Sequence, residues 1–117
     1  MTSQELAKRI GALAQEKKGS QIVIINISEK SDFADYFVII SGSSNIQVKA
    51  ICDHIEDELR NEAIRPYHKE GYEYNNWVLL DYVDVIVHIF KNETREFYGI
   101  ERLWADAEME FIKEETS

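Results

Sequence analysis

The residues of this sequence best suited to chemistry are the serines of Ser41-Gly42-Ser43-Ser44 and the carboxylates of Asp81 and Asp84. The serines follow an apolar run and precede a helical pattern, a place where backbone N–H groups and the helix dipole favour a phosphate. Nucleotidyl transfer would also require paired carboxylates that hold Mg²⁺ on a neighbouring strand. Asp81 and Asp84 flank a turn and lack the i, i+2 spacing that puts two side chains on one face. Helix capping and a turn explain these residues better, and a small Mg²⁺-dependent nucleotidyltransferase is the alternative hypothesis.

The sequence gives little support for a nucleophilic serine or for a metal site. No G-x-S-x-G motif surrounds the serines, and His54, His68 and His88 lie far apart without a second ligand at metal spacing. We therefore predict no catalytic residue, no metal site and no cofactor. His88 stands within the apolar run Val85–Phe90, which predicts a buried structural imidazole that needs a hydrogen-bond partner.

The charge of the chain restricts its partners. Thirteen Lys and Arg against 22 Asp and Glu give a formal net charge of −9, which repels a phosphate backbone. Direct nucleic-acid binding is therefore not expected as the main contact. A basic protein would be attracted, although an acidic surface also serves solubility alone.

Length and composition predict one globular domain over residues 1–117, because 117 residues with 44% hydrophobic and 30% charged side chains can bury one core. The single cysteine, Cys52, excludes an internal disulfide and fits a reducing compartment. The first residues carry acidic groups and no continuous apolar run, and no apolar run reaches the length of a membrane span. We expect a cytoplasmic protein.

The first half of the chain predicts a helix, two strands and a second helix. Thr2 and Glu5 fit a capping box before a helical repeat of apolar residues, and Gly19 supplies a stop. Ile22–Ile27 and Tyr36–Ile40 are β-branched runs that predict buried strands joined in a hairpin. Ser44 and Gln47 fit a second capping box before a longer helix.

The second half predicts a short edge strand within 67–74, strands at Trp77–Leu80 and Val85–Phe90, a helical segment at Glu93–Tyr98 stopped by Gly99, and a final helix over about 100–113. The order αββαβββα indicates an α/β (α+β) fold, a mixed sheet flanked by helices. Residues from about 108 to 117 are expected to form a frayed acidic tail.

Large aromatic and charged residues crowd the stretch between Trp77 and Trp104. A core has no use for Arg95, Tyr98 and Glu101 placed so close together. Tyr and Trp are frequent binding anchors, since they combine a large apolar surface with a polar atom. The pattern favours a recognition surface at Tyr98 and leaves Trp77 and Trp104 open between surface and core.

Several motifs in order resemble the ribosomal silencing factor family, also called RsfS or Iojap-like. They include Asp35-Tyr36-Phe37-Val38-Ile39-Ile40-Ser41-Gly42-Ser43-Ser44, Trp77-Val78-Leu79-Leu80-Asp81-Tyr82, Val87-His88-Ile89-Phe90, Phe97-Tyr98 and Leu103-Trp104. The resemblance covers the chain from Leu6 to about Ala107. One departure is Val83, where relatives usually carry Gly, a residue that allows the positive φ of a tight turn.

The resemblance implies a nucleotidyltransferase-like fold without catalytic carboxylates and a protein that is not an enzyme. It implies binding to the large ribosomal subunit through its fourteenth ribosomal protein. Such binding would sterically block association with the small subunit and repress translation under nutrient limitation. It also implies a homodimer of the free protein, for which the apolar face of the first helix, with Leu6, Ile10 and Leu13, is the candidate contact. A purely structural dimerisation domain is a third, weaker hypothesis.

Matching positions assign residues to two groups. The ribosome-facing patch is expected to comprise Trp77, Asp81, Arg95, Tyr98, Glu101, Leu103 and Trp104. In physical terms Tyr98 and Leu103 would be anchors, and Asp81 and Glu101 would meet basic groups, whereas Arg95 could instead hold the local loop through a carboxylate. A second group is interpreted as fold-determining: Asp35, Tyr36, Gly42, Ser44, Gln47 and His88.

Overall fold

The computed structural model describes residues 1–114. The helices are α1 (Ser3–Glu16), α2 (Asn45–Asn61), α3 (Asn92–Tyr98) and the 3₁₀ helix η1 (Ile100–Trp104). The strands are β1 (Ser20–Asn26), β2 (Tyr36–Gly42), β3 (His68–Glu70), β4 (Trp77–Asp81), β5 (Val85–Lys91) and β6 (Glu108–Phe111). None of the helices within the described part of the chain combines the length and apolar character needed to cross a bilayer.

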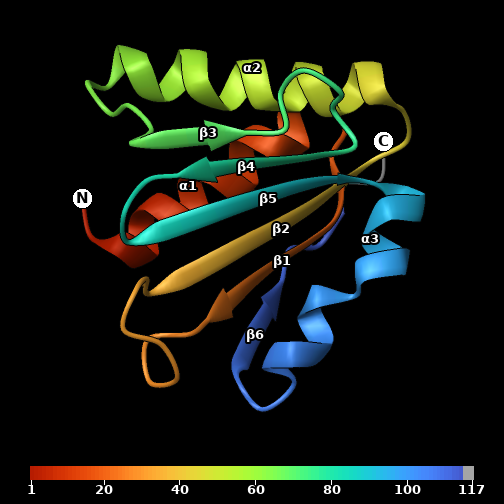
Figure 1. The fold of residues 1–117 in the computed structure, drawn as a ribbon. Coiled ribbons are helices and arrows are strands. Elements are labelled where there is room, and N and C mark those ends of the chain that lie inside the picture. Colours follow the sequence, from red (N-terminus) through yellow and green to blue (C-terminus); the bar gives the residue numbers. More distant parts are fainter. Residues whose placement is uncertain (115–117) are drawn as a thin grey trace.

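The strands form one mixed sheet in the order β3-β4-β5-β2-β1-β6 (Figure 1). β2 and β5 pair in parallel at the centre, and the other neighbours pair antiparallel. The predicted mixed sheet flanked by helices is confirmed, together with both predicted hairpins, β1–β2 and β4–β5. The central strands β2 and β5 are buried along most of their length, which explains their continuous apolar sequences.

Local signals set the starts of both long helices. Thr2 and Glu5 form the predicted capping box of α1. Ser44 caps α2, because its Oγ accepts from the Gln47 N–H at 3.1 Å. The second half of that capping box was predicted wrongly: the Gln47 side chain bonds to Ser43 and donates to the carbonyls of Lys17 and Lys18. Gln47 therefore ties the start of α2 to the end of α1.

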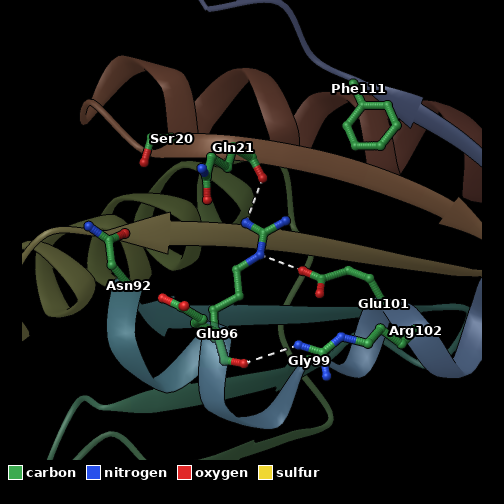
Figure 2. Close-up of a pocket in the computed structure, with 9 residues that line it drawn as sticks. Ser20, Gln21, Asn92, Glu96, Gly99, Glu101, Arg102 and Phe111 are labelled. Carbon is green, nitrogen blue, oxygen red and sulfur yellow. Dashed lines mark hydrogen bonds and ion pairs between the residues drawn. The ribbon is translucent and has the colours of Figure 1, made fainter.

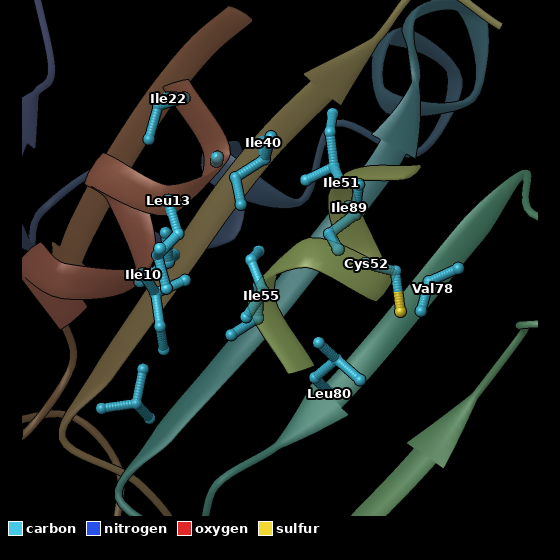
Figure 3. Close-up of a cluster of buried hydrophobic side chains, with 14 of the residues drawn as sticks. Ile10, Leu13, Ile22, Ile40, Ile51, Cys52, Ile55, Val78, Leu80 and Ile89 are labelled. Carbon is cyan, nitrogen blue, oxygen red and sulfur yellow. The ribbon is translucent and has the colours of Figure 1, made fainter. Parts of the chain in front are cut away.

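Helices α1 and α2 cover one face of the sheet and form the larger core with it. Ile10 and Leu13 of α1 meet Ile51 and Ile55 of α2 over the apolar side chains of the strands (Figure 3). The predicted use of Leu6, Ile10 and Leu13 as a dimer contact is therefore corrected. Ile10 and Leu13 are buried within the single chain, and Leu6 packs against the same core. The apolar stripe of α1 is already covered by its own sheet.

The opposite face of the sheet has a smaller core, built on Val23, Ile25, Phe37, Ile39 and Phe90. The cover of this face is thinner, because neither α3 nor η1 contains a buried residue. Partly buried Ile100 and Trp104 of η1, with Met109 of β6, pack against it. One face of the sheet is thus fully covered, and the other is covered only in part.

The predicted final helix over 100–113 is wrong beyond Trp104. The chain forms β6, which pairs antiparallel with β1 from Val23↔Phe111 to Asn26↔Glu108. The expected acidic tail from about 108 is corrected for the same residues, and 115–117 lie outside the described part of the chain. Alternation explains the strand, because Met109 is partly buried against the sheet face while Glu108 and Glu110 are exposed. Pairing also closes the edge of β1, which an acidic tail would have left open.

The β4–β5 turn has a positive φ at Val83, although this position lacks the glycine that such a conformation favours. Val83 has a φ of 73°, in the left-handed region that disfavours β-branched residues. The Asp81 carboxylate supports the turn, since its Oδ1 accepts from the Val83 N–H at 2.8 Å. Val83 therefore keeps the hairpin despite the absence of glycine.

Candidate functional site

The candidate site lies on the partly covered face of the sheet. His88 of β5 packs against Phe37 of β2, and Trp77 of β4 lies across from Phe90 of β5 in the strand register. Alternation places all of them on one face, since side chains of successive residues point to opposite sides of a strand. The result is an aromatic floor at the centre of this face.

Trp77 makes both a stacking contact and a hydrogen bond within this floor. It stacks on Phe90 with ring centroids 4.7 Å apart, and its Nε1–H donates to His88 Nδ1 at 3.1 Å. Its side chain is half-buried, so it belongs to both the core and the surface. In the structure Trp77 supports the candidate surface from below.

His88 is buried, as its apolar neighbours predicted. Burial lowers the pKa of its imidazole to about 4, because the charged form loses hydration. The bond from Trp77 to Nδ1 places the proton of the neutral ring on Nε2. That nitrogen has no hydrogen-bond partner within residues 1–114. The role of His88 here is to orient Trp77.

The α3–η1 segment lies over this floor and presents the exposed side chains. The Tyr98 ring lies 4.9 Å from Trp77, and Trp104 meets Phe37 edge-on at 5.5 Å. Trp104 is half-buried, whereas Tyr98 is 53% exposed and Leu103 79% exposed. Tyr98 and Leu103 are therefore the predicted anchors that the structure leaves free for a partner.

Two further exposed apolar residues were missed by the sequence reasoning. Phe97 is 80% exposed and packs edge-on against Tyr98, and Phe33 is 61% exposed and lies 6.1 Å from Phe37. Phe97 could have been found beside Tyr98 in the sequence. Phe33 lies in a polar loop, and only the folded chain brings it next to the aromatic floor.

Arg95 and Glu101 do not both face outward. They form an ion pair whose side chains are 11% and 25% exposed. Arg95 Nη1 also donates to the Gln21 carbonyl at 2.6 Å and to Ser41 Oγ at 2.9 Å. The expectation that Glu101 meets basic groups on a partner is corrected, because its carboxylate is engaged within the chain. Figure 2 shows Gln21 and Glu101 converging on one guanidinium.

The other candidate carboxylate, Asp81, lies on β4 two residues beyond Leu79 and is half-buried. Its oxygen caps the turn at Val83. Residues 1–114 contain no group of three His, Cys, Asp or Glu side chains that could hold a metal ion. Asp81 is thus a turn residue at the border of the candidate surface.

The residues interpreted as fold-determining make structural contacts. Gly42 leaves no room for a side chain, since a Cβ would lie 2.9 Å from Val48 Cγ2. The backbone N–H of Asp35 donates to the Asp84 carbonyl at 2.8 Å, and Tyr36 packs against the larger core. Ser44 caps α2 as described. His88, the remaining member of this group besides Gln47, belongs to the aromatic floor through its contacts with Phe37 and Trp77.

The family model described as ribosomal silencing factor during starvation, RsfS, matches residues 1–117. The chain belongs to the ribosomal silencing factor family. A ribosomal silencing factor RsfS from Halalkalibacterium halodurans is 38% identical over 92% of this chain and 92% of its own length. The RsfS protein of Bacillus subtilis is 36% identical over 92% of this chain and 91% of its length.

More distant relatives carry other names. A mouse protein named mitochondrial assembly of ribosomal large subunit protein 1 is 30% identical over 80% of this chain and 42% of its own length. Among solved structures, a crystal structure of a Chromobacterium violaceum protein superposes with a TM-score of 0.87 at 30% identity, covering 97% of this chain and 96% of that one. Membership in the ribosomal silencing factor family supports a role in ribosome silencing or assembly.

Proposed function

We propose that this protein binds the large ribosomal subunit through its fourteenth ribosomal protein and sterically blocks joining of the small subunit. It acts as a non-enzymatic repressor of translation when nutrients are limited. The observation that best supports this proposal is the partly covered face of the sheet. There Tyr98 and Leu103 are exposed beside half-buried Trp77 and Trp104. We define these four residues, with Phe33 and Phe97, as the aromatic patch.

The composition of the aromatic patch supports a protein partner. Large rings held by a rigid sheet provide contact area at low cost in conformational entropy, as binding hot spots do. Exposed apolar side chains that gather on one face are a recognised mark of interaction surfaces. The patch contains six apolar or aromatic side chains drawn from a loop, β4, α3 and η1.

The charges around the aromatic patch support a cationic partner. The β1–β2 loop, the β4–β5 turn and the η1–β6 loop contain Glu29, Asp32, Asp35, Asp84 and Asp106 against Lys30. Strand register places these connections at one end of the sheet, next to Phe33. Complementary potential would steer a basic ribosomal protein onto this end.

The side chains first considered for catalysis have structural uses instead. Ser44 caps α2, Ser41 accepts from Arg95, and Asp81 caps the Val83 turn. These uses favour a binding module over the nucleotidyltransferase alternative. Titration calorimetry with Mg²⁺ and a nucleoside triphosphate tests that alternative, and heat that disappears in Asp81→Asn would favour the enzyme.

Leu103→Ala tests the aromatic patch. Because Leu103 is 79% exposed, its loss should leave the fold intact. Removing a central apolar anchor costs about 1–2 kcal/mol of binding free energy, roughly a tenfold loss of affinity. Co-sedimentation with isolated large subunits measures the binding, and sucrose-gradient assays of subunit joining measure the block.

Ile46→Ala is the matched control, because Ile46 is 83% exposed on α2, on the other side of the sheet. It should bind as the unaltered protein does. Equal binding by both variants would show that the aromatic patch is the wrong surface. Binding without any effect on subunit joining would exclude the steric mechanism.

We further propose that the free protein forms a homodimer, as the family resemblance implies, and that it acts in the cytoplasm, as expected from its sequence. Because the apolar face of α1 is buried in the chain, a dimer contact would have to use another surface. Sedimentation velocity over a range of protein concentrations tests self-association. A second species that grows with concentration is the expected result.

A further inference from the structure

We propose that Arg95 is a positioning residue that fastens the segment 92–104, hereafter the arm, to the sheet. By doing so it sets the orientation of the exposed side chains that the arm presents. The arm comprises α3, Gly99 and η1. The effect of Arg95 on binding depends on the proposed function, whereas its effect on the arm does not.

The arm cannot hold its position by itself. α3 has seven residues and η1 has five, and neither contains a buried residue. Helices this short are unstable in isolation, so their position depends on contacts with the sheet. Aromatic contacts hold the arm at two strands: Tyr98 packs against Trp77 of β4, and Trp104 packs against Phe37 of β2.

On the β1–β6 side apolar packing is replaced by a groove. This groove has a volume of about 680 Å³, and Gln21, Glu96, Arg102 and Phe111 are among the residues that line it (Figure 2). Phe111 is exposed, so it does not bridge the gap. The Arg95 side chain crosses from α3 to β1 and β2 at this place.

Arg95 joins three parts of the chain to α3. Its guanidinium pairs with Glu101 of η1 and donates to Gln21 of β1 and Ser41 of β2. The Gln21 carbonyl is available because the β1–β2 register shifts between Ser20 and Val23, where Gln21 has a φ of 47°. A planar guanidinium with several donors fixes both distance and angle, which a lysine ammonium does not.

The pair with Glu101 also acts across the bend of the arm. Gly99 separates the two helices at a φ of 51°, and Arg95 and Glu101 lie on either side of it. Fixing these two residues to each other and to the sheet fixes the angle between α3 and η1. The relative positions of Tyr98 and Leu103 follow from that angle.

Tryptophan fluorescence tests the arm without any partner. The two tryptophans, Trp77 and Trp104, both lie under or on the arm. In Arg95→Met we expect acrylamide quenching to rise roughly twofold while the far-UV circular dichroism is kept, because local opening exposes both rings. Arg95→Lys should lie between, since one ammonium can replace only part of the contacts.

Arg102→Met is the control for quenching, because it removes an exposed arginine of the same arm whose hydrogen bond to the Glu96 carbonyl is 3.4 Å long. It should quench as the unaltered protein does. Unchanged quenching in Arg95→Met would overturn the proposal. If Arg95→Met fails to fold, the same comparison is made with Arg95→Lys and Glu101→Gln, and unchanged quenching in both would overturn it equally.

Binding to isolated large subunits completes the test. Arg95→Met should bind roughly tenfold more weakly. Arg60→Met, the same charge change at an exposed position of α2, should bind normally. Normal binding by Arg95→Met with increased quenching would overturn the positioning role. If the unaltered protein does not bind large subunits, the proposed function fails, and the quenching comparison alone decides whether Arg95 fastens the arm.

Discussion

At the residue scale, the pair of Trp77 and His88 explains why a histidine stands in a buried strand. The imidazole accepts from the indole N–H at 3.1 Å and so fixes the ring that supports Tyr98. The sequence predicted the burial of His88 from its apolar neighbours. It could not predict Trp77 as the partner, because an eleven-residue separation becomes a contact only through the β4–β5 register.

Stability should depend on pH through His88. Its folded-state pKa is about 4, below the ordinary value of 6.5, so the unfolded chain binds a proton more readily between these values. The contribution of neutral His88 to the free energy of unfolding should therefore be fully present above about pH 6.5. It should be lost as pH drops toward 4, by at most about 3 kcal/mol. Urea midpoints for the unaltered protein and His88→Gln measure this, and the variant should lose most of the dependence.

The control for this experiment is His68→Gln, since His68 is exposed on the edge strand β3. It should keep the pH dependence of the unaltered protein. A slope that survives in His88→Gln would assign the effect to other groups.

At the element scale, the order of helices and strands was predictable as far as η1, and the error came after it. Capping residues at Thr2 and Ser44 and long apolar runs are local signals, and these elements were predicted correctly. β6 has four residues, and its partners in β1 lie 82 to 88 residues earlier in the chain, from Asn26↔Glu108 to Val23↔Phe111. Its alternation of Glu with Met and Phe is a weak signal until β1 provides a neighbour.

The same limit applies to the arm. α3 and its stop at Gly99 were predicted from sequence, with Gly99 in the left-handed conformation as a C-cap glycine should be. The contact of Arg95 with Ser41 spans 54 residues, and no local pattern contains it. Sequence reasoning therefore named Tyr98 and Leu103, missed the exposed rings of Phe33 and Phe97, and mistook the direction of Glu101.

The β4–β5 turn gives a stability prediction at this scale. Val83→Gly should raise stability by roughly 0.5–1 kcal/mol, because relief of a β-branched residue at positive φ exceeds the added entropy of the unfolded chain. Urea denaturation measures the change. Asp84→Gly is the matched control, since its φ is not in the left-handed region, and it should destabilise; a loss of stability in Val83→Gly would show that the turn carries no strain.

At the scale of the whole molecule, acidic loops gather at the end of the sheet next to the aromatic patch. Glu29, Asp106 and Glu108 line one pocket there. Asp35 and Asp84 are neighbours, because the Asp35 N–H donates to the Asp84 carbonyl. A net charge of −9 extends this bias over the chain. Charge would bring a cationic partner to the surface, and the rings would hold it.

Reversing charge at this end separates two kinds of partner. Asp106→Lys with Glu108→Lys should slow association with large subunits if the contact is a basic protein, and the slowing should fade as salt rises. Association rates at several salt concentrations measure this. Faster association would indicate that RNA phosphate is the main contact.

The pairing of β6 with β1 affects how the chain folds during its synthesis. β1 is synthesised early, but its outer edge stays unpaired until Glu108–Phe111 leave the ribosome. Over that interval the apolar strand Ile22–Ile25 offers open N–H and C=O groups to any neighbouring chain. The chain is thus most prone to mispairing during its own synthesis, before β6 covers the edge of β1.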